Sequence, residues 1–298
     1  MSFRNIQRAI WLLVAAISLP ACSTRQPAAT DTIYVSILPL RGLVHEIVGD
    51  DLPIEVLVPA GASPESFEPT PRQFVALNEA QLVCSVGLID FETTLLQKLD
   101  NPQKLVNLSE GVDLLAGSCS HGHGLEQAHT HGHDGHHHAH GIDPHIWTSP
   151  RALRQMAAHA YAAIRTHYPD STKYERNYLR LCEKLDSLDA QTARRIAASG
   201  VQLIVLYHPA LTYYARDYGV QQLAIEEDGK EPSARHLARL IEQARANQVR
   251  RIFYQSQFPA STVEVIAGDI GAEAVQIDPL REDVLANIEE ITRLITEQ

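Results

Sequence analysis

The sequence predicts an α/β protein of two lobes, each a mostly parallel sheet flanked by helices, joined by one long bridging helix. Short apolar runs alternate with amphipathic stretches of helical period along most of the chain, which is typical of parallel sheets covered by helices. Near the middle of the chain, residues 169–199 carry a helical pattern long enough to link two lobes. The chain of 298 residues also suffices for two lobes.

The first 22 residues are not part of this fold. Two arginines precede an apolar run, residues 9–19, that has the length of a signal-peptide core and is too short to cross a bilayer. The run ends in Leu-Pro-Ala-Cys, which resembles the bacterial lipobox, so Cys22 is the predicted lipidation site. The alternative is an ordinary secretory signal with an incidental cysteine. We expect a polar tether at residues 23–31 and an extracytoplasmic domain, anchored by lipid at a bacterial membrane in the periplasm or at the cell surface.

The composition is acidic and poor in cysteine. The formal charge is −11, and it becomes −13 without the signal peptide, which holds two basic and no acidic residues. Such a charge argues against nucleic acid as a partner and suits a protein that binds cations. Cys84 and Cys182 fall in apolar or helical patterns and are expected in the core, whereas Cys119 lies beside histidines and could bind metal. No Cys-x-x-Cys pair is present, so a zinc ribbon is not expected.

The first lobe is predicted to cover residues 32–168. Its strands are short apolar runs, and its helices carry apolar residues every three or four positions. Three prolines stiffen the loop 59–71 after the second strand, and Ser149 followed by a proline predicts the start of the lobe's last helix. The expected elements, in order, are a strand at 33–38, a helix at 40–48, a strand at 54–58, a helix at 71–80, a strand at 82–86, and helices at 91–99 and 149–168.

The bridging helix and the second lobe, residues 200–298, follow. Thr172 and Glu175 have the spacing of a capping box, and the apolar positions from Tyr174 onward recur every three or four residues, which predicts a helix of roughly 40 Å. Beyond Gly200 the alternation of strands and helices resumes. The expected strands are at 203–206, 222–225, 251–254 and 273–277, and the expected helices begin at about 210 and cover 233–246, 261–270 and 281–295.

Histidines concentrate in one segment of the first lobe, residues 118–141. Nine of the twenty residues from 121 to 140 are histidine, separated by glycines and almost no apolar residue, so we expect a loop without a packed core. Neutral imidazole is a common ligand of zinc-like metals, which predicts weak, multiple metal binding there. The nine are His121, His123, His129, His131, His133, His136, His137, His138 and His140.

Four other metal-ligating residues lie in ordered loops. Glu65 follows the second strand, His145 precedes the Ser149 helix, and His208 and Asp278 follow strands of the second lobe. In parallel α/β sheets such loops converge at the carboxyl ends of the strands. Two imidazole nitrogens and two carboxylates suffice for tetrahedral zinc. We therefore expect one site in a cleft between the lobes.

The residues around these candidates resemble the zinc-binding solute-binding lipoproteins of bacterial metal ABC importers. The matching motifs occur in the family's order and span nearly the whole mature chain: Gly61-Ala62-Ser63-Pro64 with Glu68-Pro69-Thr70-Pro71, Asp143-Pro144-His145-Ile146-Trp147, His208-Pro209-Ala210, residues 227–233, and Asp278-Pro279-Leu280. The resemblance implies metal ligands at His145, His208 and Asp278. It also implies delivery of the metal to a permease subunit in the cytoplasmic membrane, and we expect a monomer.

Glu65 departs from the family pattern, in which zinc-binding members usually have histidine. A carboxylate can ligate zinc, so the site can consist of Glu65, His145, His208 and Asp278. Alternatively Glu65 points away, and water or a histidine of the loop takes the fourth position. The harder ligand shifts preference toward manganese or iron, but manganese-binding relatives usually replace the histidine that corresponds to His208. We therefore predict Zn²⁺.

The predicted function is capture of Zn²⁺ in the cleft for import, without enzymatic activity. The histidine-rich loop would raise the local zinc concentration. One alternative is a manganese or iron importer component. A second is a zinc hydrolase, which needs an open coordination position for water; no HExxH motif is present. A third is a surface adhesin, which no specific residue supports.

Overall fold

The computed structural model describes residues 30–117, 141–169, 171–227, 229–258 and 260–297. The predicted signal peptide, the lipidation site Cys22, Cys119 and the nine clustered histidines lie outside the described residues. Among the described helices, none combines the length and hydropathy that crossing a membrane requires.

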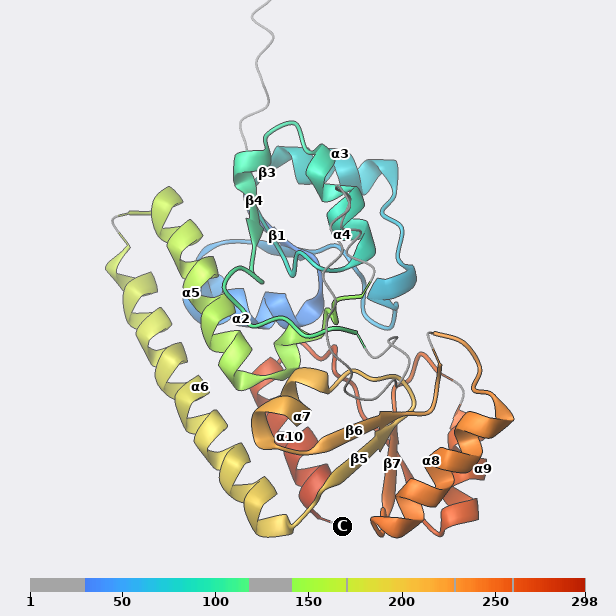
Figure 1. Cartoon of the computed structure of the whole chain (residues 1–298). Helices are drawn as coiled ribbons and strands as arrows, with labels where there is room; N and C mark the ends of the chain where they lie inside the picture. Colours follow the sequence, from blue (N-terminus) through green and yellow to red (C-terminus); the bar gives the residue numbers. More distant parts are fainter. Residues whose placement is uncertain (1–29, 118–140, 170, 228, 259, 298) are drawn as a thin grey trace, which may run out of the picture.

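Two four-stranded sheets, each entirely parallel, form the centres of the two lobes. The first has the order β2-β1-β3-β4 and the second the order β6-β5-β7-β8 (Figure 1). This arrangement confirms the predicted two-lobed α/β class. The strands are β1 (Thr30–Val35), β2 (Ile54–Val56), β3 (Ala80–Ser85), β4 (Leu105–Asn107), β5 (Leu203–Leu206), β6 (Gln221–Ala224), β7 (Arg251–Tyr254) and β8 (Glu273–Gln276).

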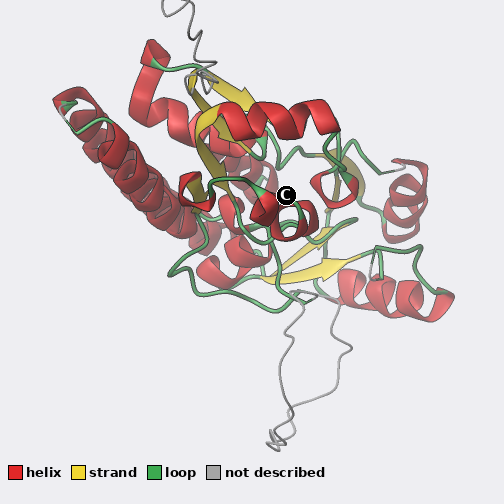
Figure 2. Cartoon of the chain, turned by 90° about the horizontal axis from the view of Figure 1, so that it is seen from above, coloured by secondary structure: helices red, strands yellow, loops and turns green. Residues whose placement is uncertain are grey.

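Helices cover the faces of both sheets, as Figure 2 shows from a second direction. They are held by buried apolar stripes, and several begin at side chains that accept a backbone N–H bond, such as Ser149, whose Oγ accepts from Ala152 N. The helices are α2 (Leu38–Val48), α3 (Pro71–Glu79), α4 (Asp90–Thr94), α5 (Pro150–His167), α6 (Thr172–Ser199), α7 (Thr212–Tyr218), α8 (Ala234–Ala246), α9 (Ala260–Ile270) and α10 (Val284–Thr296).

Helix α6 is the bridging helix that the sequence predicts. It has 28 residues, packs against α2 and α5, and also against α7 and α10 of the second lobe. Its buried stripe includes Leu181, Leu185 and Ile196. One apolar cluster contains Val35 of the first sheet, Leu185 of α6 and Leu206 of the second sheet, so the two lobes share a continuous core. A second cluster lies among α8, α9 and the second sheet.

Three local features differ from the sequence prediction. Strand β4, three residues long, was not predicted; it exists because it pairs with β3. The helix expected at 91–99 is the short α4 followed by a 3₁₀ turn, Leu96–Lys98. The side chain that caps α6 belongs to Ser171 rather than Thr172, because Ser171 Oγ accepts from Tyr174 N. Cys84 and Cys182 are buried free thiols, as expected.

Candidate metal centre

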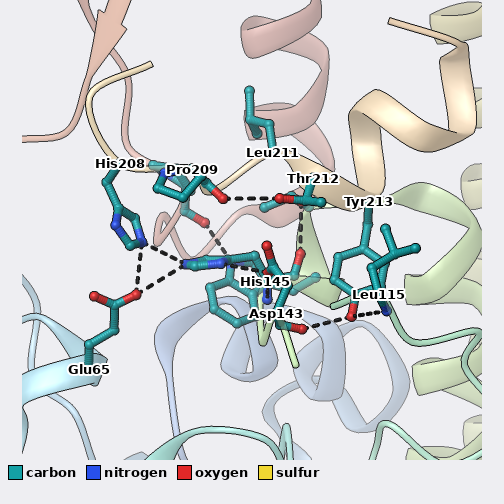
Figure 3. Close-up of polar contacts among 12 residues, drawn as sticks. Glu65, Leu115, Asp143, His145, His208, Pro209, Leu211, Thr212 and Tyr213 are labelled. Carbon is teal, nitrogen blue, oxygen red and sulfur yellow. Dashed lines mark hydrogen bonds and ion pairs between the residues drawn. The ribbon is translucent and has the colours of Figure 1, made fainter. Parts of the chain in front are cut away.

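Three of the four ordered candidates meet between the lobes. Glu65 lies in a 3₁₀ turn, Pro64–Ser66, after β2, and His145 directly precedes the 3₁₀ turn Ile146–Thr148. His208 lies two residues after β5. One ligand atom from each of the three lies within 4.8 Å of the others, and Figure 3 shows the three side chains directed toward one another. Residues 80 and 63 positions apart in sequence therefore form one metal site.

The spacing of the ligand atoms fits a tetrahedral ion. The two Nε2 atoms of His145 and His208 are 3.3 Å apart, and Glu65 Oε1 lies 2.8 Å from His208 Nε2 and 3.8 Å from His145 Nε2. Ligands at the bond lengths of zinc, placed on a tetrahedron, are about 3.3–3.6 Å from one another. The three observed separations bracket that range.

Asp143 fixes the ring of His145. Its Oδ1 atom accepts from the backbone N of His145 at 2.8 Å and lies 2.8 Å from the ring Nδ1. A proton on Nδ1 leaves Nε2 free as the metal ligand. Burial alone would raise the pKa of Asp143, but the charge and the hydrogen bonds of His145 outweigh it and hold that pKa below its usual value. The backbone carbonyl of Asp143 in turn accepts from the hydroxyl of Tyr213 at 2.7 Å (Figure 3).

Glu226 fixes the ring of His208, as Asp143 fixes that of His145. Its Oε1 atom lies 2.8 Å from His208 Nδ1, so the Nε2 atom faces Glu65 and His145. Burial would lower the pKa of His208, but hydrogen bonds to Glu226 and Glu65 raise it to about 9. In the metal-free protein His208 is therefore an imidazolium that donates to both carboxylates. A metal ion must displace the proton on Nε2.

Glu65 is the most exposed of the three ligands. Its side chain is 43% exposed, against 10% for His145 and 12% for His208. Burial would raise its pKa, but the hydrogen bond with His208 and the nearby histidine charges lower it overall. Three carboxylates thus surround two imidazoles, which gives a strong excess of negative charge when the rings are neutral. This charge favours a divalent cation.

Apolar and amide groups complete the cavity. The ring of Phe258 stacks on the ring of His208, with their centroids 5.2 Å apart. The ring of Trp147 packs against the ring of His145, with their centroids 5.1 Å apart. Gln255 donates from Nε2 to the carbonyl of His208 at 3.0 Å, which fixes the backbone of that ligand. The full lining is Ser63, Pro64, Glu65, Ile89, Pro144, His145, Trp147, His208, Ala210, Gln255, Gln257, Phe258, Pro279 and Leu280.

Asp278, the fourth predicted ligand, is not in the group of three. It follows β8, as predicted, but its Oδ1 accepts from Leu280 N at 2.9 Å. Its neighbours Pro279 and Leu280 line the cavity, so the carboxylate lies close in the chain to the wall of the site. Its role as a ligand remains a prediction.

Sequence reasoning missed the two supporting carboxylates, Asp143 and Glu226. A signal for each was present. Asp143 stands two residues before His145, a spacing that suits a turn closed by the carboxylate. Glu226 lies two residues after the end of β6, at the same edge of the second sheet as His208.

The fold and the site define a two-lobed binding protein with a metal centre of two histidines and a glutamate. The chain belongs to the family described as "Zinc-uptake complex component A periplasmic", which matches residues 33–296. This membership confirms the resemblance found in the sequence.

Individual relatives agree with the family. The zinc-binding lipoprotein AdcA of Streptococcus pneumoniae is 29% identical over 274 residues, which cover 90% of this chain and 54% of AdcA. The chain thus spans about half the length of that relative. A crystal structure of ZnuA is 30% identical with a TM-score of 0.78, covering 90% of this chain and 98% of that one. A ZnuA deletion mutant with zinc bound is 31% identical with a TM-score of 0.77, covering 90% and 97%.

Proposed function

We propose that this protein captures Zn²⁺ outside the cytoplasm, at Glu65, His145 and His208, and delivers it to the permease of an ABC importer. The observation that carries the proposal is the convergence of the three ligand atoms, within 4.8 Å, at a cavity between the two lobes. The relatives described as zinc-binding or zinc-uptake proteins support zinc as the ion. Lipidation at Cys22 would keep the domain at the membrane that holds the permease.

Coordination by these residues accounts for both capture and release. The carboxylate–histidine pairs leave both Nε2 atoms oriented before the metal arrives, which reduces the entropic cost of binding. The shared core across α6 limits relative motion of the lobes. Release would therefore involve small displacements of the loops that carry the ligands, imposed by the permease.

Two features support zinc over manganese or iron. Both imidazoles are present, and imidazole suits zinc, whereas carboxylate and water suit manganese. The observed ligand separations, 2.8 to 3.8 Å, also bracket those of a tetrahedral zinc shell. Glu65 would act as a ligand, with Asp278 as the candidate for the fourth position.

Calorimetric titration of the mature chain with zinc and manganese tests the proposal. We expect one tight zinc site, weakened by at least about tenfold in both Glu65→Ala and His208→Ala, and weaker binding of manganese. Glu264→Ala is the matched control, because Glu264 is an exposed carboxylate on α9, away from the cavity. If both site variants titrate like the wild type, the cleft is not the metal site.

A further inference from the structure

Helix α2 of the first lobe makes an unusually close backbone approach to the second lobe at Gly42. A Cβ atom built on Gly42 would overlap the carbonyl oxygen of Glu282 and lie 3.0 Å from its carbonyl carbon. Gly42 lies in the interior of α2, where its backbone does not require glycine, and glycine is a poor helix former. The close approach is therefore the physical reason for glycine at this position.

The segment that meets Gly42 is the loop 278–283, which also forms one wall of the metal cavity. Pro279 and Leu280 line that cavity together with the three metal-binding side chains. An ion pair between Arg41 and Glu282 joins the loop to α2 beside the glycine. The start of α10, which follows the loop, lies against α2 between the two lobes (Figure 1).

Hydrogen bonds make this loop stiff. The carbonyl of Asp278 accepts from Asn287 Nδ2 at 2.8 Å, and the carbonyl of Glu282 accepts from Val284 N at 2.8 Å. The carbonyl of Pro279 accepts from the buried Trp147 Nε1 at 2.9 Å. These bonds attach the loop to α10 and to Trp147, so we expect a displacement at Glu282 to extend to Pro279 and Leu280.

We propose that Gly42 is a positioning residue for the metal centre, because the absence of a side chain there lets α2 set the place of loop 278–283 against the ligands. The ion pair between Arg41 and Glu282 stabilises the same contact between α2 and the loop. A methyl group at residue 42 must separate helix and loop by on the order of 1 Å. The displacement reaches a ligand through Trp147, whose Nε1 donates to the Pro279 carbonyl and whose ring packs against His145. Metal sites tolerate only a few tenths of an ångström in ligand position. This inference rests on the proposed function, because it requires a metal in the cavity.

The test compares two glycines that both lie in helices, in the mature chain. Gly268 of α9 has no atom within 4 Å of a built Cβ, so Gly268→Ala changes helix propensity without a clash. We expect Gly42→Ala to weaken zinc binding by about tenfold or more, within the range of coupling between distant sites. The absorption spectrum of bound cobalt(II) should also change, because it reports the geometry of the ligands. Gly268→Ala should match the wild type in both measurements.

The outcomes separate this inference from the proposed function. Tight zinc binding and an unchanged cobalt spectrum in Gly42→Ala overturn the inference while leaving the function intact. Absence of a cleft site in the wild type overturns both. If Gly42→Ala does not fold, Arg41→Gln decides, because it removes the ion pair without adding bulk. A loss of a few-fold in zinc affinity in Arg41→Gln supports the inference, and unchanged affinity contradicts it.

Discussion

Asp143 and Glu226 lie outside the group of three candidate ligands, and each contacts the Nδ1 atom of one candidate histidine, which directs its Nε2 atom toward the site. Glu226 Oε1 lies 2.8 Å from His208 Nδ1. We expect Glu226→Gln, which keeps the shape and removes the charge, to lower zinc affinity by about 10–100-fold. Titration of this variant beside Glu264→Gln checks the expectation, because Glu264 is an exposed carboxylate that does not line the cavity. Equal affinities in the two variants would mean that the ring of His208 is oriented by its other contacts.

The raised pKa of His208 predicts proton release on metal binding. With that pKa at about 9, His208 is protonated at pH 7 in the metal-free protein, whereas zinc requires the neutral ring. Zinc binding should therefore release close to one proton from this group at pH 7 and none well above pH 9. Affinity should fall steadily as the pH decreases below about 9. Calorimetry at pH 7 in buffers of different ionisation enthalpy measures the release, and a heat that is independent of the buffer would contradict it.

The three clustered ligands could be predicted from the sequence because their positions follow a general rule. Glu65 and His208 come after strands of parallel sheets, and such positions meet at one edge. The rule does not say which side chain turns inward. Asp278 satisfies it equally well, yet its Oδ1 accepts from Leu280 N. That choice depends on loop geometry over a few ångströms, which composition and periodicity do not encode.

The start of helix α5 depends on one buried side chain, that of Ser149. Ser149 is fully buried, its Oγ accepts from Ala152 N at 3.2 Å, and it donates to Asp217 of α7. Ser149→Ala removes the side chain that caps α5. It also removes one hydrogen-bond donor to the buried carboxylate of Asp217. We expect a loss of about 1–3 kcal/mol in the free energy of unfolding. Urea denaturation measures this loss. Ser233 is the exposed cap of α8, so Ser233→Ala should lower the free energy of unfolding by less. A smaller loss at Ser149 than at Ser233 would contradict this.

Long periodic elements and the apolar strands could be predicted from the sequence, whereas strand β4 could not. Helix α6 repeats its apolar stripe over 28 residues, so its existence did not depend on any single position. Strand β4 has three residues and exists through its pairing with β3, so it has no period of its own. The choice between Ser171 and Thr172 as the cap of α6 likewise depends on backbone angles, since both side chains can accept the bond.

The molecule as a whole should unfold as one unit. Val35, Leu185 and Leu206 belong to one buried cluster that extends from the first sheet through α6 to the second. Neither lobe keeps that core if the other unfolds. We expect a single transition in scanning calorimetry of the metal-free chain, with equal calorimetric and van't Hoff enthalpies. Two separated transitions would show that the lobes are independent and that α6 acts only as a tether.

The histidine-rich segment and the cleft should bind zinc in different ways. The cleft holds each ring by a carboxylate and by an aromatic contact, so its geometry is set before binding. The nine histidines at 121–140 have a composition that cannot build a packed core, which predicts weak and multiple binding. Deleting residues 121–140 should therefore remove the weakly bound zinc ions from a zinc titration and leave one tight site.

The same deletion tests what the segment contributes to transport. If it raises the local zinc concentration, cells that carry the deletion should import zinc more slowly only when zinc is scarce, since the tight site saturates when zinc is abundant. A substitution in the cleft, such as His208→Ala, should reduce import at both concentrations. Equal uptake by the deletion variant and the wild type at scarce zinc would assign the entire function to the cleft.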